Sequence, residues 1–331
     1  MEYKSSYARI GNFSNIDFIS KKICKTYNLG LFKKSELIEI GYEDFNYYLI
    51  TENDKYVVKI FNVERDESSC KRLIDILLKS YNNHIAVPRL YSHNGEYIYQ
   101  IEVDGILLRM FVMQYVGKDF WSLGRDLDSK ELKEVAKIAA TVNSIDYDIS
   151  EAFYDEWAVV NLCSEYEKKK QCLDEEDSLF VHDIVDDFSR INLDSFRHSY
   201  VHGDMIKANL LLDDDNRIHV VDFSGFNYFP RIVEITAVLL GLCLTDKRET
   251  TIKKMNEFLN YYNGYSLIED NELESLPLML KSLAAMFIIQ ASFIKKSMGD
   301  YVENEYWYKE GKKFLDMQID SGAFSLIKKR Q

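Results

Sequence analysis

A change of hydrophobic pattern about a third of the way along the chain is the strongest constraint on its fold. Up to residue 115, short runs rich in Val, Ile, Tyr and Phe predict β-strands, whereas after Gly117 apolar residues recur mainly at helical spacing. The strand-like runs cover residues 37–41, 47–51, 56–61, 97–101 and 107–115, and one β-rich segment returns at 210–223. The pattern predicts a small β-rich lobe followed by a larger helical lobe.

The first lobe also contains two expected helices, a short one at 14–28 and an amphipathic one at 66–82. The two lobes meet near residues 114–117, which divides the chain into lobes 1–115 and 116–331. A length of 331 residues is typical of about two such units. Because a connector between lobes is a common place for a ligand site, we expect the site at this joint.

The charge balance argues against two classes of partner. The chain carries 41 Lys and Arg residues against 54 Asp and Glu, a formal net charge of −13. Such a surface repels the phosphates of nucleic acids and of anionic membranes. We therefore expect neither a nucleic acid nor a membrane as partner.

Cysteine usage and the apolar segments indicate the compartment. The five cysteines are far apart and never form a C-x-x-C pair, which favours reduced thiols over disulfides or a zinc site. The most apolar stretch, residues 283–294, has about 12 residues, whereas a bilayer-spanning helix needs roughly 20. We expect a buried helix there, and a cytoplasmic protein.

The stretch from residue 201 to 223 carries the strongest chemical signal. It reads Val-His-Gly-Asp-Met-Ile-Lys-Ala-Asn-Leu-Leu-Leu, then a turn, then Ile-His-Val-Val-Asp-Phe. The predicted hairpin brings Asn209 beside Asp222, with Asp204 across from them on a loop. Two oxygen ligands next to a separate carboxylate suit Mg²⁺ bound at phosphates while that carboxylate orients an attacking hydroxyl.

Each of these residues alone has an ordinary structural explanation. Asp and Asn in turns usually cap or bend the backbone. The combination is more specific, because His202, Gly203, Asp204 and Asn209 stand at fixed spacing and Asp222 follows a strand eighteen residues after Asp204. We interpret the whole stretch as a phosphate-transfer site.

A lysine in the third strand provides independent support. Strand alternation puts Val57 and Lys59 on one face of the run 56–61 and Val58 and Ile60 on the other. A lysine in an apolar strand is costly unless an anionic group meets it. The alternative is a solvent-facing lysine on an edge strand.

These motifs resemble those of the aminoglycoside phosphotransferase/choline kinase superfamily, a branch of the protein-kinase-like fold. The loop His202-Gly-Asp-x₄-Asn209 resembles its catalytic loop, and Val221-Asp-Phe223 its metal-binding segment. The resemblance implies an α+β, bilobal protein-kinase-like fold that binds ATP and Mg²⁺. It implies that Asp204 is the catalytic carboxylate and that Asn209 and Asp222 hold the metal.

The resemblance also implies a nucleotide site in the N-terminal lobe. Lys59 would meet the α- and β-phosphates and Val57 would cover the adenine. The segment from Gly41 to Asn46 stands where a phosphate-covering loop would lie, and it is similar to that of hydroxylysine kinase and type II homoserine kinase relatives. The run 109–117 resembles their hinge strand, so the backbone of Gln114, Tyr115 and Val116 would bind the adenine edge.

Three positions depart from the wider family pattern. The carboxylate that usually pairs with the strand lysine is not evident: Glu67 and Asp75 are the two candidates, and Glu67 is favoured by its place on the inward stripe of the helix. Ser224 replaces the glycine of the D-F-G motif of protein kinases. Glu234 stands where many relatives have a second aspartate after the metal site.

The distance from Asp222 to the next helix indicates the size of the acceptor. Only about eight residues, 223–230, separate them, and no A-P-E motif follows, whereas protein kinases need a longer segment to bind a peptide. We predict an ATP- and Mg²⁺-dependent transfer to a hydroxyl of a small molecule: an amino alcohol, a hydroxy amino acid or an aminoglycoside-like sugar. The alternative is a pseudokinase that binds nucleotide without transferring phosphate.

Overall fold

The structure is a computed structural model that describes residues 6–38, 43–149, 154–299 and 302–326. Its contacts divide the chain into two units, Met1–Gly117 with Asp213–Val221, and Lys118–Leu212 with Asp222–Gln331. The segment 213–221, which the sequence prediction placed in the second lobe, belongs to the first unit. One reason is that the Val220 N–H donates to the Ala86 carbonyl at 2.8 Å.

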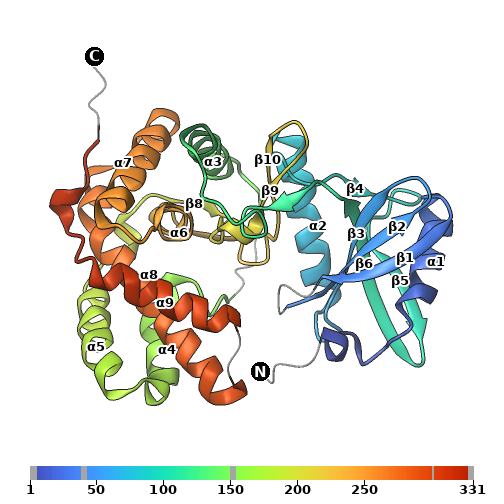
Figure 1. Ribbon diagram of the computed structural model, residues 1–331, viewed down its shortest axis with the longest axis horizontal. Coiled ribbons are helices and arrows are strands. Elements are labelled where there is room, and N and C mark those ends of the chain that lie inside the picture. Colours follow the sequence, from blue (N-terminus) through green and yellow to red (C-terminus); the bar gives the residue numbers. More distant parts are fainter. Residues whose placement is uncertain (1–5, 39–42, 150–153, 300–301, 327–331) are drawn as a thin grey trace. The chain divides into compact units, whose positions relative to one another are not determined.

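The first unit is built on an antiparallel sheet in the order β1-β2-β3-β6-β4, with β5 also paired to β6. Figure 1 shows helices α1 and α2 on opposite sides of it. The elements of this unit are β1 (Phe32–Ile38), β2 (Phe45–Thr51), β3 (Lys55–Ile60), β4 (Leu90–Tyr91), β5 (Tyr99–Val103), β6 (Ile106–Gln114), β10 (Ile218–Val220), α1 (Ile16–Tyr27) and α2 (Glu67–Asn82), after a 3₁₀ turn at Ser6–Ile10.

The two faces of this sheet differ in polarity, as the alternation of β3 predicted. Val58 and Ile60 are fully buried in a core that also includes Ile19 and Ile23 of α1. On the opposite face, the Cα partners of Lys59 are Asn46 of β2 and Phe111 of β6. One face therefore stabilises the unit by apolar burial alone, whereas the other combines the buried Phe111 with the buried Lys59.

The second unit is mainly helical, with short strands that position loops. It contains β7 (Lys118–Asp119), α3 (Ser129–Val142), α4 (Leu162–Lys169), α5 (Glu175–Ser189), β8 (His198–Val201), β9 (Leu210–Leu212), β11 (Asn227–Pro230), α6 (Ile232–Cys243), α7 (Arg248–Tyr265), α8 (Asp270–Met298) and α9 (Val302–Asp316). Every residue of α6 is buried, and α8 packs against α4, α5, α6 and α9. A β-rich first unit and a helical second unit confirm the predicted α+β class.

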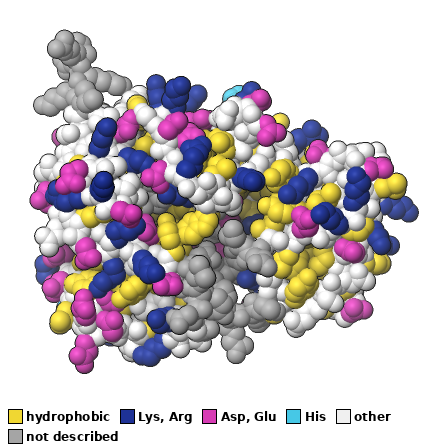
Figure 2. Space-filling model, viewed as in Figure 1, with side chains coloured by type: hydrophobic (Ala, Val, Ile, Leu, Met, Phe, Trp, Pro, Cys, Tyr) yellow, Lys and Arg dark blue, Asp and Glu magenta, His cyan; other side chains and the backbone are white. Residues whose placement is uncertain are grey.

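Helix α8 contains the apolar stretch 283–294. By length and composition α8 could cross a membrane, but 78% of its apolar window is buried within the protein. The stretch is therefore the buried helix that the sequence predicted. On the face shown in Figure 2, basic and acidic side chains are interspersed, so the acidic surplus does not gather there into one patch.

Candidate active site

The loop after β8 is held by one buried carboxylate. Strands β8 and β11 form an antiparallel ribbon, and the chain leaves β8 into the loop 202–209. Glu234, in the first turn of α6, accepts hydrogen bonds through Oε2 from the backbone N–H groups of His202 at 2.5 Å and Gly203 at 3.2 Å. Gly203 has φ +76°, a conformation that favours glycine.

Within the described part of the protein, no side chain neutralises the charge of the Glu234 carboxylate. Its side chain is fully buried, and its Oε1 atom has no hydrogen-bond partner among the residues that the structure describes. Burial raises the pKa of Glu234 to about 7, against the lowering effect of the two backbone donors. The loop therefore depends on a carboxylate that is ionised only near or above neutral pH.

His202 connects the loop to the segment that carries Asp222. Its buried ring lies 4.5 Å from the ring of Phe223, centroid to centroid. Its Nδ1 atom accepts the backbone N–H of Asp204 at 3.2 Å. His202 thus braces the backbone of the loop.

The structure brings Asp204 and Asn209 into direct contact. The Asn209 Nδ2 group donates to Asp204 Oδ2 at 2.7 Å and to the Asp204 carbonyl at 3.0 Å. Because both acceptors are oxygens that cannot donate, the amide orientation is set, and Asn209 Oδ1 is the atom left to face a ligand. Among the described residues, none donates to this oxygen.

Asp222 has the geometry of a constrained site residue. It adopts φ +62°, which is rare for a residue other than glycine and is often found at functional sites. Its Oδ1 atom accepts the hydroxyl of Ser224 at 2.5 Å. Ser224, where protein kinases have glycine, therefore orients the carboxylate.

The donor set of Asn209 and Asp222 fits a hard divalent cation. Both offer oxygen atoms, which Mg²⁺ and Ca²⁺ prefer. No group of three His, Cys, Asp or Glu side chains within the described ranges could hold a metal ion. A cation at Asn209 and Asp222 would therefore take its remaining ligands from phosphates or water, as Mg²⁺ does at nucleotide sites.

In the first unit, Lys59 is buried next to an unexpected carboxylate. Its Nζ atom lies 3.6 Å from Asp44 Oδ2, and the Asp44 side chain is fully buried. Asp44 Oδ1 accepts from Arg65 Nε at 3.0 Å and from the Asn62 N–H at 3.0 Å. Asp44 is therefore surrounded by two cations and a backbone donor.

Both carboxylates that the sequence suggested as partners of Lys59 are wrong. Glu67 is half-exposed and pairs with Lys71 at 2.5 Å. Asp75 is exposed on the same helix. Helical spacing correctly placed both residues on α2. Glu67, however, is not on the inward stripe: it lies in the first turn of the helix, and its carboxylate pairs with Lys71 on the helix surface.

The other predicted nucleotide-binding residues lie on or near the sheet. Val57 is on the same face as Lys59 and pairs with Tyr48 and Met113 of the neighbouring strands. Asn46 is the β2 partner of Lys59, and its Oδ1 atom is buried with no hydrogen-bond partner in the described chain. Gly41 lies outside the described residues.

One backbone N–H group of the predicted hinge already makes a hydrogen bond within the protein. The Gln114 N–H donates to the Arg89 carbonyl at 2.9 Å, so it is not available to a ligand. Tyr115 and Val116 follow the end of β6, and within the described ranges no backbone hydrogen bond is made by either. The ring of Tyr115 packs against Tyr48 and lies 4.2 Å from Lys55 Nζ.

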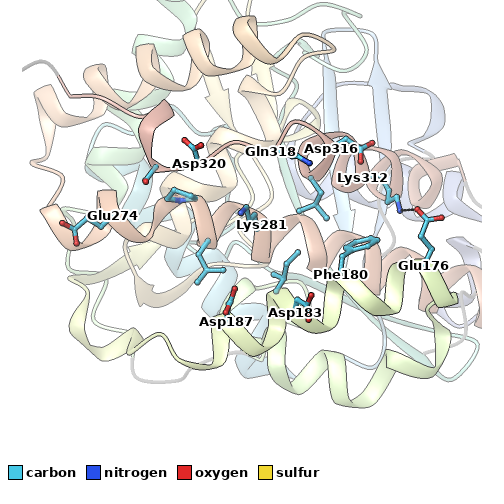
Figure 3. Close-up of a pocket in the computed structure, with 15 residues that line it drawn as sticks. Glu176, Phe180, Asp183, Asp187, Glu274, Lys281, Lys312, Asp316, Gln318 and Asp320 are labelled. Atoms are coloured by element: carbon cyan, nitrogen blue, oxygen red, sulfur yellow. Dashed lines mark hydrogen bonds and ion pairs between the residues drawn. The ribbon is translucent and has the colours of Figure 1, made fainter.

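One cavity of the second unit lies away from this loop. It has a volume of about 770 Å³ and opens between α5, α8 and α9, where Phe180 and Pro277 line it together with acidic side chains such as Asp183 and Asp316 (Figure 3). No residue of the loop 202–209 lines it. We therefore do not assign it to phosphate transfer.

The fold and the loop together define a kinase-like phosphotransferase. A model of the phosphotransferase enzyme family (APH) matches residues 34–264, more than half of the chain. The chain belongs to this family, which confirms the superfamily suggested by the motifs. No curated protein matches the sequence significantly.

Solved structures with the same fold cover nearly the whole chain. An amicoumacin kinase, hAmiN, in complex with AMP-PNP, Ca²⁺ and Ami is 16% identical, with TM-score 0.68 over 94% of this chain and 95% of the other. The choline kinase LicA from Streptococcus pneumoniae is 14% identical, with TM-score 0.61 over 92% and 99%. A microcompartment-associated aminopropanol kinase is 13% identical, with TM-score 0.60 over 91% and 95%.

At these identities the likeness shows the fold alone, and it confirms the predicted kinase-like architecture. Family membership supports small-molecule phosphotransferase activity for this chain. The complex of hAmiN with AMP-PNP and Ca²⁺ shows that a protein of this fold binds a nucleotide and a divalent cation.

Proposed function

We propose that the protein is an ATP- and Mg²⁺-dependent kinase that phosphorylates a hydroxyl group of a small, amine-bearing molecule. The observation that carries the proposal is the contact between Asp204 and Asn209. Asn209 Nδ2 holds the carboxylate at 2.7 Å while its Oδ1 atom stays available for a cation. One amide thereby links a proton-accepting carboxylate to a metal ligand.

Each residue has a definite role in the proposed reaction. Asp204 orients the acceptor hydroxyl and takes its proton late, as the new O–P bond forms and the bond to the ADP oxygen breaks. Lys59 holds the α- and β-phosphates. Asn209 and Asp222 hold Mg²⁺, which when bound neutralises charge on the phosphates.

Two observations favour a small acceptor that carries an amine. Only the short strand β11 (Asn227–Pro230) stands between Asp222 and α6, which leaves no long segment on which to lay a peptide. The three structures with this fold named above are kinases of amicoumacin, choline and aminopropanol. Amino alcohols, hydroxy amino acids and aminoglycoside-like sugars remain the acceptor classes to test.

The test is ADP release with ATP and Mg²⁺ across a panel of hydroxylated amines, amino acids, sugars and aminoglycosides. We expect acceptor-dependent turnover that Asp204→Asn lowers by about 10²–10⁴-fold, the usual contribution of a positioned acid–base group. Asp214→Asn, which removes an exposed turn carboxylate, is the matched control and should keep full turnover.

Two results would overturn the proposal. Turnover that survives Asp204→Asn would remove the carboxylate from the chemistry. Nucleotide-induced thermal stabilisation with no turnover of any acceptor would favour the pseudokinase alternative instead.

A further inference from the structure

A buried ion pair lies directly before the helix that carries Glu234. Arg231 immediately precedes α6, and its side chain pairs with Glu272 in the first turn of α8. Both side chains are fully buried. A buried ion pair is weak evidence of a contribution to stability, because an apolar pair of similar volume is often as good. The geometry that this pair fixes is therefore the more informative property.

The guanidinium of Arg231 joins the start of α6 to the end of α7 and the start of α8. Its Nε atom donates to Glu272 Oε1 at 3.1 Å, and its Nη2 atom donates to the other carboxylate oxygen. Just after α7, the Ser266 hydroxyl accepts from Nη1 at 2.8 Å and the Leu267 carbonyl accepts from Nη2 at 2.7 Å. Because a guanidinium is a planar fork with donors in fixed directions, these bonds set the position of Arg231 relative to both helices.

The backbone of Arg231 connects this position to both sides of the loop 202–209. Its N–H donates to the Arg197 carbonyl at 2.7 Å, just before β8, and its carbonyl accepts the Glu234 N–H at 3.1 Å. Strand β8 leads into the loop, and the Glu234 carboxylate holds the first two N–H groups of that loop. The strand that enters the loop and the carboxylate that holds it are therefore both tied to Arg231.

A second series of contacts leads from Arg231 to the same strand. The ring centroid of Tyr262, in α7, lies 5.9 Å from the guanidinium carbon of Arg231. The Tyr262 hydroxyl donates to Asn143 Oδ1 at 2.6 Å, and Asn143 Nδ2 donates to the Tyr200 carbonyl at 2.8 Å. Tyr200 lies in β8, two residues before His202. Groups packed around Arg231 thus hold β8 at a second point.

We infer that Arg231 is a positioning residue for phosphate transfer, which it serves by fixing the start of α6 so that Glu234 meets the loop. The inference rests on the proposed function and deepens it. Arg231 touches no reacting atom, and it acts by setting the position of Glu234. Glu234 in turn holds the backbone of the two residues that precede Asp204. Since a misplacement of about 1 Å can cost an enzyme about 10²-fold in rate, a change at Arg231 should lower kcat.

The first experiment separates positioning from stability. Arg231→Met should lower the urea midpoint of unfolding, because it leaves the Glu272 carboxylate buried without its partner. The double variant Arg231→Met/Glu272→Gln removes both charges and keeps an oxygen that accepts the Glu269 N–H, so its midpoint should recover most of the loss. For the acceptor with the highest turnover in the panel, kcat of the double variant should stay about 10- to 100-fold below wild type. The KM of ATP should change less than about twofold.

Two variants of the same helix are the matched controls. Leu276 is buried one turn after Glu272 in α8. Leu276→Ala should lower the urea midpoint by loss of packing and keep the kcat of the wild type at a temperature where the variant is folded. Glu274→Gln, which removes an exposed carboxylate of α8, should change neither quantity.

A double-mutant cycle tests whether Arg231 acts through Glu234. At pH 8, above the pKa of Glu234, Glu234→Gln alone should lower kcat, because a neutral amide accepts the loop N–H groups less strongly than a carboxylate does. If both residues act in one series, Arg231→Met/Glu272→Gln should lower kcat less than about twofold further in the Glu234→Gln background. Two independent structural effects would multiply instead.

Hydrogen exchange measures the loop without any acceptor. The N–H groups of His202 and Gly203 donate to Glu234, so the exchange of a peptide covering 202–209 reports on these bonds. We expect this peptide to lose protection in Arg231→Met/Glu272→Gln and to exchange as in the wild type in Glu274→Gln.

The outcomes distinguish this inference from the proposed function. Recovery of kcat together with the urea midpoint in the double variant would overturn the inference and make the ion pair purely structural. Multiplying effects in the cycle, or unchanged exchange of the loop, would overturn it as well. The proposed function fails separately, if turnover survives Asp204→Asn or no acceptor is phosphorylated. The exchange measurement then still confirms or overturns the role of Arg231 in holding the loop.

Discussion

Two buried carboxylates, Asp44 in the first unit and Glu234 in the second, are stabilised in opposite ways, although other buried carboxylates of the second unit, such as Glu272 beside Arg231, do meet cations. In the first unit, Asp44 lies among side-chain cations, with Lys59 Nζ at 3.6 Å and Arg65 Nε at 3.0 Å. In the second unit, Glu234 meets two backbone N–H groups and no cation within the described residues, and burial raises its pKa.

The difference follows from what each carboxylate has to do. Asp44 holds a lysine that is proposed to meet phosphates, so its partners are side chains that carry charge. Glu234 holds the shape of a loop, and two backbone donors suffice for that purpose. Backbone dipoles compensate a buried charge less completely than an ion does, and a raised pKa is the result. The comparison predicts different responses to mutation and to pH.

Removal of the Asp44 charge should have the largest effect. Asp44→Asn leaves Lys59 and Arg65 without their shared carboxylate in a buried setting, and breaking a buried pair costs about 3–5 kcal/mol. The free energy of unfolding, measured by urea denaturation at pH 7, should fall by that amount.

The neighbouring residue provides a control for this prediction. Glu43 pairs with the same arginine at 2.7 Å, but its side chain is 38% exposed. Glu43→Gln should therefore cost about 1 kcal/mol or less. Glu67→Gln, on the carboxylate that pairs with Lys71, should alter neither ATP turnover nor folding measurably. Equal losses in Asp44→Asn and Glu43→Gln would contradict the buried-pair interpretation.

Glu234 should make the free energy of unfolding depend on pH in the range between its pKa in the unfolded chain and its pKa in the folded protein. Its pKa is about 7 in the folded protein, against 4.5 ordinarily. Between these values the folded state keeps a proton that the unfolded chain has lost, so the contribution of Glu234 to stability is complete below pH 4.5 and declines as pH rises to 7. Each pH unit is worth ~1.4 kcal/mol, so the decline is about 3 kcal/mol at most.

The variant Glu234→Gln isolates this dependence, because glutamine does not titrate. The difference in unfolding free energy between wild type and variant, measured from pH 4.5 to 8, should fall with pH up to about 7 and then level off. Asp155, whose pKa burial raises to about 6, titrates in a similar range, but it is present in both proteins and cancels. Parallel profiles would show that Glu234 is ionised throughout.

Ser224 should have the smallest effect. Its hydroxyl donates to Asp222 Oδ1 at 2.5 Å and orients the proposed metal ligand. Ser224→Ala should raise the Mg²⁺ concentration for half-maximal activity about 10-fold, the lower end of what outer-shell mutations cost. Ser189→Ala, a change on the surface of α5, is the control. An unchanged Mg²⁺ dependence would remove Ser224 from the site.

Local patterns in the sequence predicted most of the fold. Strand alternation in 56–61 identified which residues of β3 share a face, and the predicted helix at 66–82 is α2, which Asp66 caps by accepting the Ser69 N–H. These features depend on neighbouring residues, so a window of a few positions contains the information. The segment 213–221 was assigned to the wrong unit because its contact with Ala86 joins positions far apart in the chain.

The part of the candidate site that lies within one continuous segment of the chain could be predicted from the sequence. Asp204 and Asn209 are five residues apart, and their contact is local. The pairing of Lys59 with Asp44 was missed, although Asp44 belongs to the segment 41–46 that the motif had singled out. Helical spacing drew attention to Glu67 and Asp75, and nothing in the spacing showed that the carboxylate would come from the segment just before β2.

The sequence by itself determined the family, the two-part α+β organisation and the chemistry proposed for the loop 202–209, because motif spacing and hydrophobic period are local properties. Only the tertiary structure decided which charges meet. Asp44 meets Lys59 of the neighbouring strand, and Glu234 meets the loop from a helix 32 residues later. Burial raises the cost of an uncompensated charge, and burial is set by packing between segments that are distant in the chain.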